Sequence, residues 1–161
     1  MALHTGCRKN ELLGLEWLRV DLQANLIYLE AHHTKTRQRR AVPLNQEARA
    51  ALLNRARFRA EFCPGTPWVF CDEKGQRIGN VRRAFETACR RIGLKDFRIH
   101  NLRHTCAAWL VRAGVALAEA RDLLGHASIT MTERYAHLAP ENVWAAVAVL
   151  DSVSRSGHVA S

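Results

Sequence analysis

The sequence predicts one mainly α-helical α+β domain that contains a small three-stranded antiparallel sheet. Its 161 residues, 48% of them apolar, suffice for one substantial core and are too few for a second full domain. Residues 18–44 form short runs of β-type sequence, which predict the sheet. From residue 80 onward the pattern is helical and is interrupted at glycine and proline, which predicts a helical second half.

The first half of the chain divides into a short helix, a sheet and a longer helix. Residues 8–17 (RKNELLGLEW) have the apolar spacing of an amphipathic helix and follow a Thr5-Gly6 turn. The runs LRVDL, NLIYLEA and RRAVPL predict strands, with TKTRQ as a hairpin turn. Asn45 is a suitable N-cap for a helix over 45–62, which ends before Pro64.

Five further helices are expected over 80–92, 100–113, 116–124, 128–136 and 140–151. We therefore expect residues 1–151 to form the domain. The small polar residues of 152–161 predict a flexible tail.

The formal charge of +9, with 24 Lys+Arg against 15 Asp+Glu, favours a polyanionic partner such as nucleic acid. No run of about 18 apolar residues and no secretory signal is present, so the sequence predicts a cytoplasmic protein. The five cysteines include no C-x-x-C pair, which predicts reduced packing residues rather than a disulfide framework or a zinc site.

The densest cluster of polar groups with chemical potential lies between His100 and Tyr135. His100 and Arg103 are three positions apart, which places both side chains on one helix face, where they can clamp a phosphate. His104 shares a face with His100, so a metal pair is conceivable. The spacing has no glutamate after His100 and no evident third ligand, however, so no metal or other cofactor is expected.

Four segments together resemble the signature segments of the tyrosine recombinase (phage integrase) family. They are TGCRKNELLGL (5–15), TKT with VPL (34–36 and 42–44), HNLRHTCAAWL (100–110) and LLGHASITMTERYAH (123–137). They follow the family's order with similar gaps and cover nearly the whole chain. One such segment is weak evidence, and four in register are strong.

The resemblance implies the fold of a DNA breaking-rejoining enzyme and a complete catalytic set: Arg8, Lys35, His100, Arg103, His126 and Tyr135. Guanidinium forks suit the charge that develops on the non-bridging phosphate oxygens. Tyr135 is the implied nucleophile, with His100 as proton acceptor and Lys35 as general acid for the 5′ oxygen. His126 would donate a hydrogen bond to the phosphate or position the nucleophile.

Each residue also has an ordinary structural interpretation. Arg8 can pair with Glu11 on its own helix, Lys35 can be a solvated turn residue, His100 and His126 can be structural histidines, and the Tyr135 ring can pack near Met131. These interpretations do not explain why all the residues occur together.

Double-stranded DNA is the expected partner, and arginines of the hairpin and of 80–92 are candidate contacts: Arg37, Arg39, Arg40, Arg82 and Arg83. The apolar segment within 141–150 resembles a C-terminal helix that docks into a neighbouring subunit, which implies a tetramer on DNA; it is equally compatible with folding onto its own core. The resemblance also implies an N-terminal core-binding domain, and we expect residues 1–151 to be the catalytic domain without that domain and without part of its first helix.

The leading hypothesis is the catalytic domain of a site-specific recombinase, typical of a phage, prophage or mobile-element integrase, that forms a 3′-phosphotyrosyl intermediate. Two alternatives remain open at this point: strand nicking and closing of the type IB topoisomerase kind, and a DNA-binding remnant without catalytic activity.

Overall fold

The computed structural model describes residues 1–30 and 39–140. The elements in chain order are α1 (Ala2–Thr5), α2 (Lys9–Leu13), η1 (Trp17–Arg19), β1 (Val20–Asp21), β2 (Leu26–Leu29), β3 (Arg40–Pro43), α3 (Gln46–Phe62), α4 (Arg82–Arg91), α5 (Ile99–Arg112), α6 (Leu117–Leu124), α7 (Thr130–Glu133) and η3 (Ala136–Leu138). The predicted class, a mainly helical α+β domain with a three-stranded sheet, is confirmed.

The sheet is antiparallel with the strand order β1-β2-β3. Ile27 of β2 pairs with Val20 on one side and with Val42 on the other. Ile27, Val42 and Leu29 are buried whereas Tyr28 is exposed, so the side chains alternate between the core and solvent as a half-buried sheet requires. The predicted turn 34–38 lies outside the described residues.

Helix α3 begins as the sequence predicts. The Asn45 side chain accepts a hydrogen bond from the Ala48 N–H at 2.9 Å, which satisfies one backbone donor of the first turn. Ala48 and Leu52 then face the sheet and are fully buried.

The predicted helix 8–17 is shorter than expected, because α2 ends at Leu13. The residues after it bind another segment instead. Trp17 N–H donates to the Pro67 carbonyl at 2.8 Å, and Val69 N–H donates to the Leu15 carbonyl at 2.9 Å. These bonds hold Leu15 and Glu16 against 67–69 before η1 begins at Trp17, and an α-helix that continued through 17 would use the same backbone groups internally.

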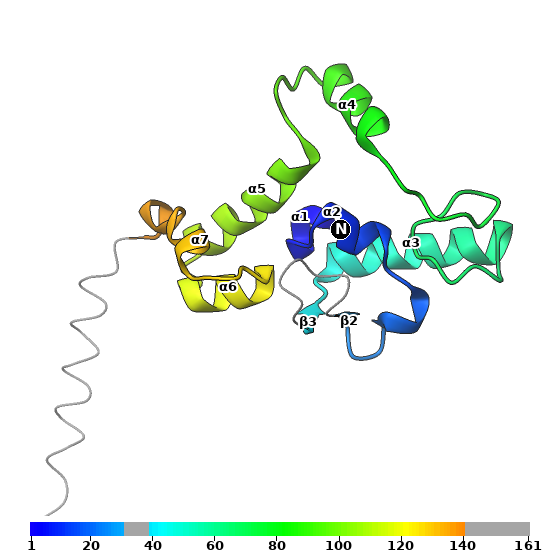
Figure 1. Cartoon of the computed structure of the whole chain (residues 1–161), viewed down its shortest axis with the longest axis horizontal. Coiled ribbons are helices and arrows are strands. Elements are labelled where there is room, and N and C mark those ends of the chain that lie inside the picture. The colour runs from blue at the N-terminus through cyan, green and yellow to red at the C-terminus, as the bar shows by residue number, and fades with distance from the viewer. Residues whose placement is uncertain (31–38, 141–161) are drawn as a thin grey trace, which may run out of the picture.

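The apolar side chains form two clusters. One lies between the sheet, α2 and α3, and the other joins α5 and α6 to Tyr135. Figure 1 shows α1 and α2 between α3 on one side and α5 and α6 on the other, so the N-terminal turn connects the two halves. The expected helix 128–136 is shorter, because α7 spans Thr130–Glu133 and the separate 3-10 helix η3 begins at Ala136. The expected helix 140–151 lies outside the described residues after its first residue, as does the whole tail 152–161.

Candidate active site

The turn between α1 and α2 brings the N-terminal segment against the helices that follow in the second half. Gly6 ends α1 with a φ of 61°, a left-handed conformation that favours glycine. A Cβ at this position would overlap the Leu124 side chain and crowd Cys106. Gly6 therefore permits the close approach that places Arg8, two residues later, beside α5 and α6.

The buried carboxylate of Glu11 organises two arginines. Its side chain is 1% exposed and accepts hydrogen bonds from Arg8 Nη1 at 2.9 Å and from the Arg8 backbone N–H at 2.7 Å. Arg40 adds bonds from Nη2 at 2.9 Å and Nη1 at 3.2 Å. Burial opposes ionisation of Glu11, but the bonds and charge of Arg40, then the bonds of Arg8, outweigh it and hold the pKa of this carboxyl below its ordinary value.

A DNA-contacting arginine is expected to be exposed, whereas Arg40 is mostly buried. Its side chain is only 11% exposed and is engaged with Glu11. The guanidinium also lies against Gly125, where any Cβ would collide with it. Arg40 stands at the start of β3, so it connects the base of the hairpin to the arginine site.

Arg8 and Arg103 are each bonded to a backbone carbonyl near the other's segment. Arg8 Nη2 donates to the Gly125 carbonyl at 2.9 Å, and Arg103 Nη1 donates to the Gly6 carbonyl at 2.6 Å. Gly125 itself ends α6 in the left-handed conformation, with a φ of 65°. These bonds bring the two arginines from opposite ends of the chain into one site.

Arg103 retains a donor for a ligand. The residue is buried, and among the described residues no atom accepts a hydrogen bond from its Nη2. Burial, followed by the charge of Arg8, lowers the pKa of the guanidinium to about 10, so it is still charged at neutral pH. A buried cation with an unpaired donor beside a second arginine is suited to an anionic oxygen.

His126 lies next to this pair. Its Nδ1 is 2.8 Å from the hydroxyl of Thr132, which is fully buried. Burial, then the charges of Arg103 and Arg8, lower the pKa of His126 to about 4, so the ring is neutral at pH 7. When the Thr132 hydroxyl donates to Nδ1, Nε2 carries the proton and is a hydrogen-bond donor.

Tyr135 is buried, and its hydroxyl is hydrogen-bonded to Nδ1 of His104. The family resemblance implies His100 as the proton acceptor, whereas in the structure the Tyr135 hydroxyl is bonded to His104 instead. His100 is exposed, and its ring meets the His104 ring edge-on with 4.6 Å between centroids. Burial, then the charges of His104, Arg103 and Arg8, lower the pKa of His100, which places it in the same electrostatic environment as the arginines.

Two of the predicted site residues, Lys35 and Arg37, lie outside the described residues. The strands that flank them are described, and Arg39 Nε binds Glu30 at 2.8 Å across the base of the hairpin. The Arg39 side chain is otherwise 81% exposed and accessible to a partner. The structure therefore places five of the six predicted catalytic residues, and it brings Arg8, Arg103 and His126 together with Tyr135 nearby.

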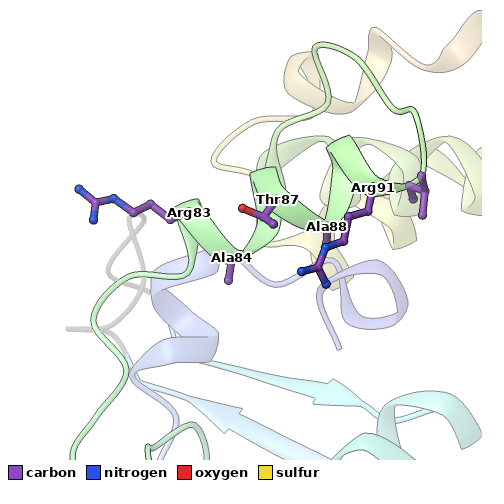
Figure 2. A pocket seen from close by; sticks show the side chains of 6 residues that line it. Arg83, Ala84, Thr87, Ala88 and Arg91 are labelled. Atoms are coloured by element: carbon purple, nitrogen blue, oxygen red, sulfur yellow. The ribbon is translucent and has the colours of Figure 1, made fainter.

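Helix α4 carries the remaining predicted DNA contacts. Figure 1 shows this helix away from the other helices, between two extended segments. Arg82 is exposed but paired with Glu86 at 2.7 Å. Arg83 and Arg91 border an open groove of about 530 Å³ on α4 whose floor includes Ala84, Ala88 and Ile92. Figure 2 shows the two arginines extending from opposite ends of this small-residue surface.

The expectation that the cysteines are packing residues agrees with the structure, because all five are buried and free. Within residues 1–30 and 39–140 no cluster of three or more potential metal ligands occurs. In the same ranges, no helix has the length and apolar character to cross a membrane.

Sequence reasoning missed two roles at this site. The sequence suggests His104 only as a metal partner of His100, and the one signal for another role is that it shares a helix face with His100; the contact to Tyr135, 31 positions away, is not evident from the sequence. The sequence suggests Glu11 only as a surface partner of Arg8, and nothing local in it indicates that Arg40 reaches Glu11 across 29 positions.

Comparison with known proteins supports one family. The model of the phage integrase family matches residues 1–142. The integrase of Salmonella phage P22 is 33% identical over 94% of this chain, and the tyrosine recombinase XerC of Corynebacterium glutamicum is 32% identical over 84%. The chain spans 41% and 44% of these two proteins, which is less than half of their length.

Solved structures show the same fold. The crystal structure of XerA recombinase superposes with a TM-score of 0.74 at 25% identity, covering 99% of this chain and 57% of that chain. The catalytic domain of bacteriophage HP1 integrase superposes with a TM-score of 0.65 at 27% identity, covering 91% of this chain and 76% of that domain. A third neighbour, XerH site-specific recombinase bound to its difH substrate in a post-cleavage complex, has a TM-score of 0.72 at 25% identity and covers 93% of this chain and 44% of that chain.

Proposed function

The chain belongs to the phage integrase family, and from this premise we propose that it is the catalytic domain of a site-specific tyrosine recombinase that breaks and rejoins DNA. Tyr135 attacks a backbone phosphate and forms a 3′-phosphotyrosyl bond, which conserves the energy needed for religation. The observation that carries this proposal is that Arg8 and Arg103 lie together at one site, where a buried N–H donor of Arg103 has no acceptor among the described residues.

Each residue of the proposed site has its own role in the reaction. Arg8 and Arg103 stabilise the charge on the non-bridging oxygens as the phosphorus becomes pentacoordinate. Neutral His126 donates from Nε2 to one of these oxygens. His100, on the exposed side of α5, is available to contact the same phosphate. Lys35 is the proposed acid for the departing 5′ oxygen, and its assignment rests on the sequence resemblance.

Replacing Tyr135 with phenylalanine is expected to abolish covalent attachment to DNA. The experiment incubates the chain with nicked duplexes of randomised sequence, so that a cleaved strand loses its end and cannot be religated. Adducts are separated on denaturing gels, and their DNA is sequenced. Wild type should give an adduct, whereas Tyr135→Phe should give none, because its ring lacks the nucleophilic oxygen.

Tyr28→Phe is the matched control, since Tyr28 is the other of the two tyrosines and lies exposed on β2. It should form adducts as wild type does. An adduct that persists in Tyr135→Phe would refute the proposal. DNA retention by wild type without any adduct would instead identify a binding module, and efficient relaxation of supercoiled plasmid by the chain alone would favour topoisomerase chemistry.

The same proposal assigns α4 to the DNA. Arg83 and Arg91 are eight positions apart, which on a helix is about 12 Å along the axis. This separation is close to the width of the major groove, about 12 Å, so the two guanidiniums suit phosphates on its two sides. Ala84 and Ala88 between them leave room for the bases to approach.

Arg83→Gln and Arg91→Gln are each expected to weaken binding to duplex DNA with little dependence on its sequence. The slope of log affinity against log salt concentration is negative, and each change should reduce its magnitude by about one, because one phosphate contact is lost. Fluorescence anisotropy over a salt series measures the slope. Arg57→Gln, which removes the same charge from an exposed position on α3, is the control and should leave the slope unchanged. Equal losses in all three variants would contradict the placement of α4.

Assembly into a tetramer on DNA stays a prediction from sequence, because the segment 141–150 lies outside the described residues. The recombinases that this chain resembles are more than twice as long, so we propose no residue of this chain as the determinant of the DNA target sequence.

A further inference from the structure

The hydroxyl of Tyr135 has a partner that the proposed catalytic set does not include. His104 follows Arg103 on α5, so its side chain is rotated by about 100° around the helix from the arginine. Arg103 therefore faces Gly6, while His104 reaches the segment after α7 and its Nδ1 bonds the Tyr135 hydroxyl. One turn of α5 thus holds both an arginine of the site and the contact to the nucleophile.

We propose that His104 is the general base that accepts the hydroxyl proton of Tyr135 during attack on the phosphate. This inference rests on the proposed function and adds a residue to it. The phenolic O–H bond breaks and an N–H bond forms at His104 Nδ1 while the Tyr135 oxygen bonds to phosphorus. The bond between phosphorus and the 5′ oxygen breaks, and that oxygen takes a proton from the general acid. Religation runs the same transfers in reverse, with His104 returning its proton to the tyrosine.

The surroundings favour this direction of proton transfer. Burial, then the charges of Arg134 and Arg103, lower the pKa of His104, so the ring is neutral and Nδ1 is free to accept when Nε2 carries the proton. Burial raises the pKa of Tyr135, against the opposing charges of Arg134 and Arg103, so the phenol is protonated in the resting enzyme. A protonated phenol bonded to a neutral imidazole is the ground state that general-base catalysis requires.

The charged and titratable groups around this pair come from each neighbouring element. Arg103, His100 and Arg112 lie on α5, Arg134 and His137 lie on either side of Tyr135, and His126 follows α6. His104, Arg112, Arg134 and His137 also line an open groove of about 530 Å³ beside Tyr135. All the charged members are cations, so they favour both the neutral imidazole and the phenolate that develops during attack.

His100 is the alternative base, and the geometry disfavours it. Its ring is edge-on to His104, and it is His104 that has the hydrogen bond to the hydroxyl. His100 packs against the base and leaves its own nitrogens for the phosphate.

The test measures single-turnover adduct formation between about pH 5 and pH 9 on a sequence recovered by the covalent selection described above. Wild type should be independent of pH above the ordinary histidine value of 6.5, since His104 is already neutral there. His104→Ala should be about 100-fold slower near neutrality, and its rate should rise about tenfold per pH unit, because attack then depends on the small phenolate fraction.

His104→Asn separates proton transfer from positioning, because its amide oxygen lies near the place of Nδ1 and accepts the hydrogen bond without accepting the proton. It should show the same pH-dependent slope as His104→Ala. Tyr28→Phe, which lies exposed on β2 outside this groove, is the control and should match wild type in rate and pH profile. Thermal melting of every variant identifies any that fails to fold.

The proposal is overturned if His104→Asn reacts at the wild-type rate with a flat profile, or if His100→Asn alone acquires the slope. Failure of the proposed function is a different result, because wild type would then form no adduct that depends on Tyr135. In Tyr28→Phe chains, where Tyr135 is the remaining tyrosine, its ultraviolet titration gives a readout without DNA. The midpoint of that titration, which is the pKa of Tyr135, should change when His104 is replaced. An unchanged midpoint would contradict the hydrogen bond between His104 and the Tyr135 hydroxyl.

Discussion

Glu11→Ala is expected to destabilise the chain by about 3–5 kcal/mol, because it leaves two buried or half-buried guanidiniums without their carboxylate. For a chain of this size that corresponds to a fall in melting temperature on the order of 10 °C. Thermal and urea unfolding measure the loss. Glu73→Ala removes an exposed carboxylate and should change stability by less than about 0.5 kcal/mol.

Stability should also depend on pH through Glu11. Its pKa is below the ordinary value of 4.5 in the folded chain, so the stabilisation is fully present above about pH 4.5 and is lost as the pH falls through the folded-state pKa. Glu11→Gln retains hydrogen-bonding groups but not the charge. The difference in unfolding free energy between wild type and Glu11→Gln should therefore be constant from about pH 5 to pH 8 and shrink in acid.

A double-mutant cycle tests whether Glu11 is the shared anchor. The losses of unfolding free energy in Arg40→Ala and Glu11→Ala should be strongly non-additive in the double mutant, since each substitution removes the same contact. Additive losses, or a difference between wild type and Glu11→Gln that grows in acid, would contradict the network. Arg40→Ala should also slow cleavage, because Glu11 positions Arg8 and Arg40 ties the hairpin base to that site.

The sequence predicts the architecture well where the signals are local. Asn45 caps α3 as expected, and the alternation around Ile27 produces the sheet, because both features depend on neighbouring residues. The helix expected over 8–17 fails for a non-local reason: residues 15–17 bond to 67–69, a segment whose partner the sequence does not reveal.

The candidate site shows the same division. Spacing predicts that Arg103 shares a helix face with His100, and the family resemblance implies Tyr135 as the nucleophile. Neither gives the rotation of α5 that points the neighbouring side chains of Arg103 and His104 in different directions. Arg8 was open to two interpretations, and the structure shows that pairing with Glu11 does not exclude a phosphate contact. The bonds to Glu11 and Gly125 use two of the five N–H groups of its guanidinium. The sequence does not predict that Arg40 is mostly buried, because an arginine beside a predicted hairpin resembles a surface residue until the buried carboxylate that binds it is known.

Arg103→Lys is expected to reduce the rate of covalent adduct formation by about 10²–10³-fold while leaving DNA affinity within a few-fold of wild type. The two ends of the Arg103 guanidinium have separate tasks, since Nη1 donates to the Gly6 carbonyl and Nη2 is unpaired among the described residues. A lysine has one ammonium on a flexible stem and cannot supply two fixed donors in a plane.

The matched control is Arg112→Lys, because Arg112 is an exposed arginine at the end of the same helix. Single-turnover cleavage and fluorescence anisotropy on the same duplex separate chemistry from binding. Equal losses of rate and affinity in Arg103→Lys would show that Arg103 only holds DNA or the fold. A selective loss of rate is expected because charge on the non-bridging oxygens is greatest in the transition state, so the second donor of the fork stabilises that state more than bound DNA.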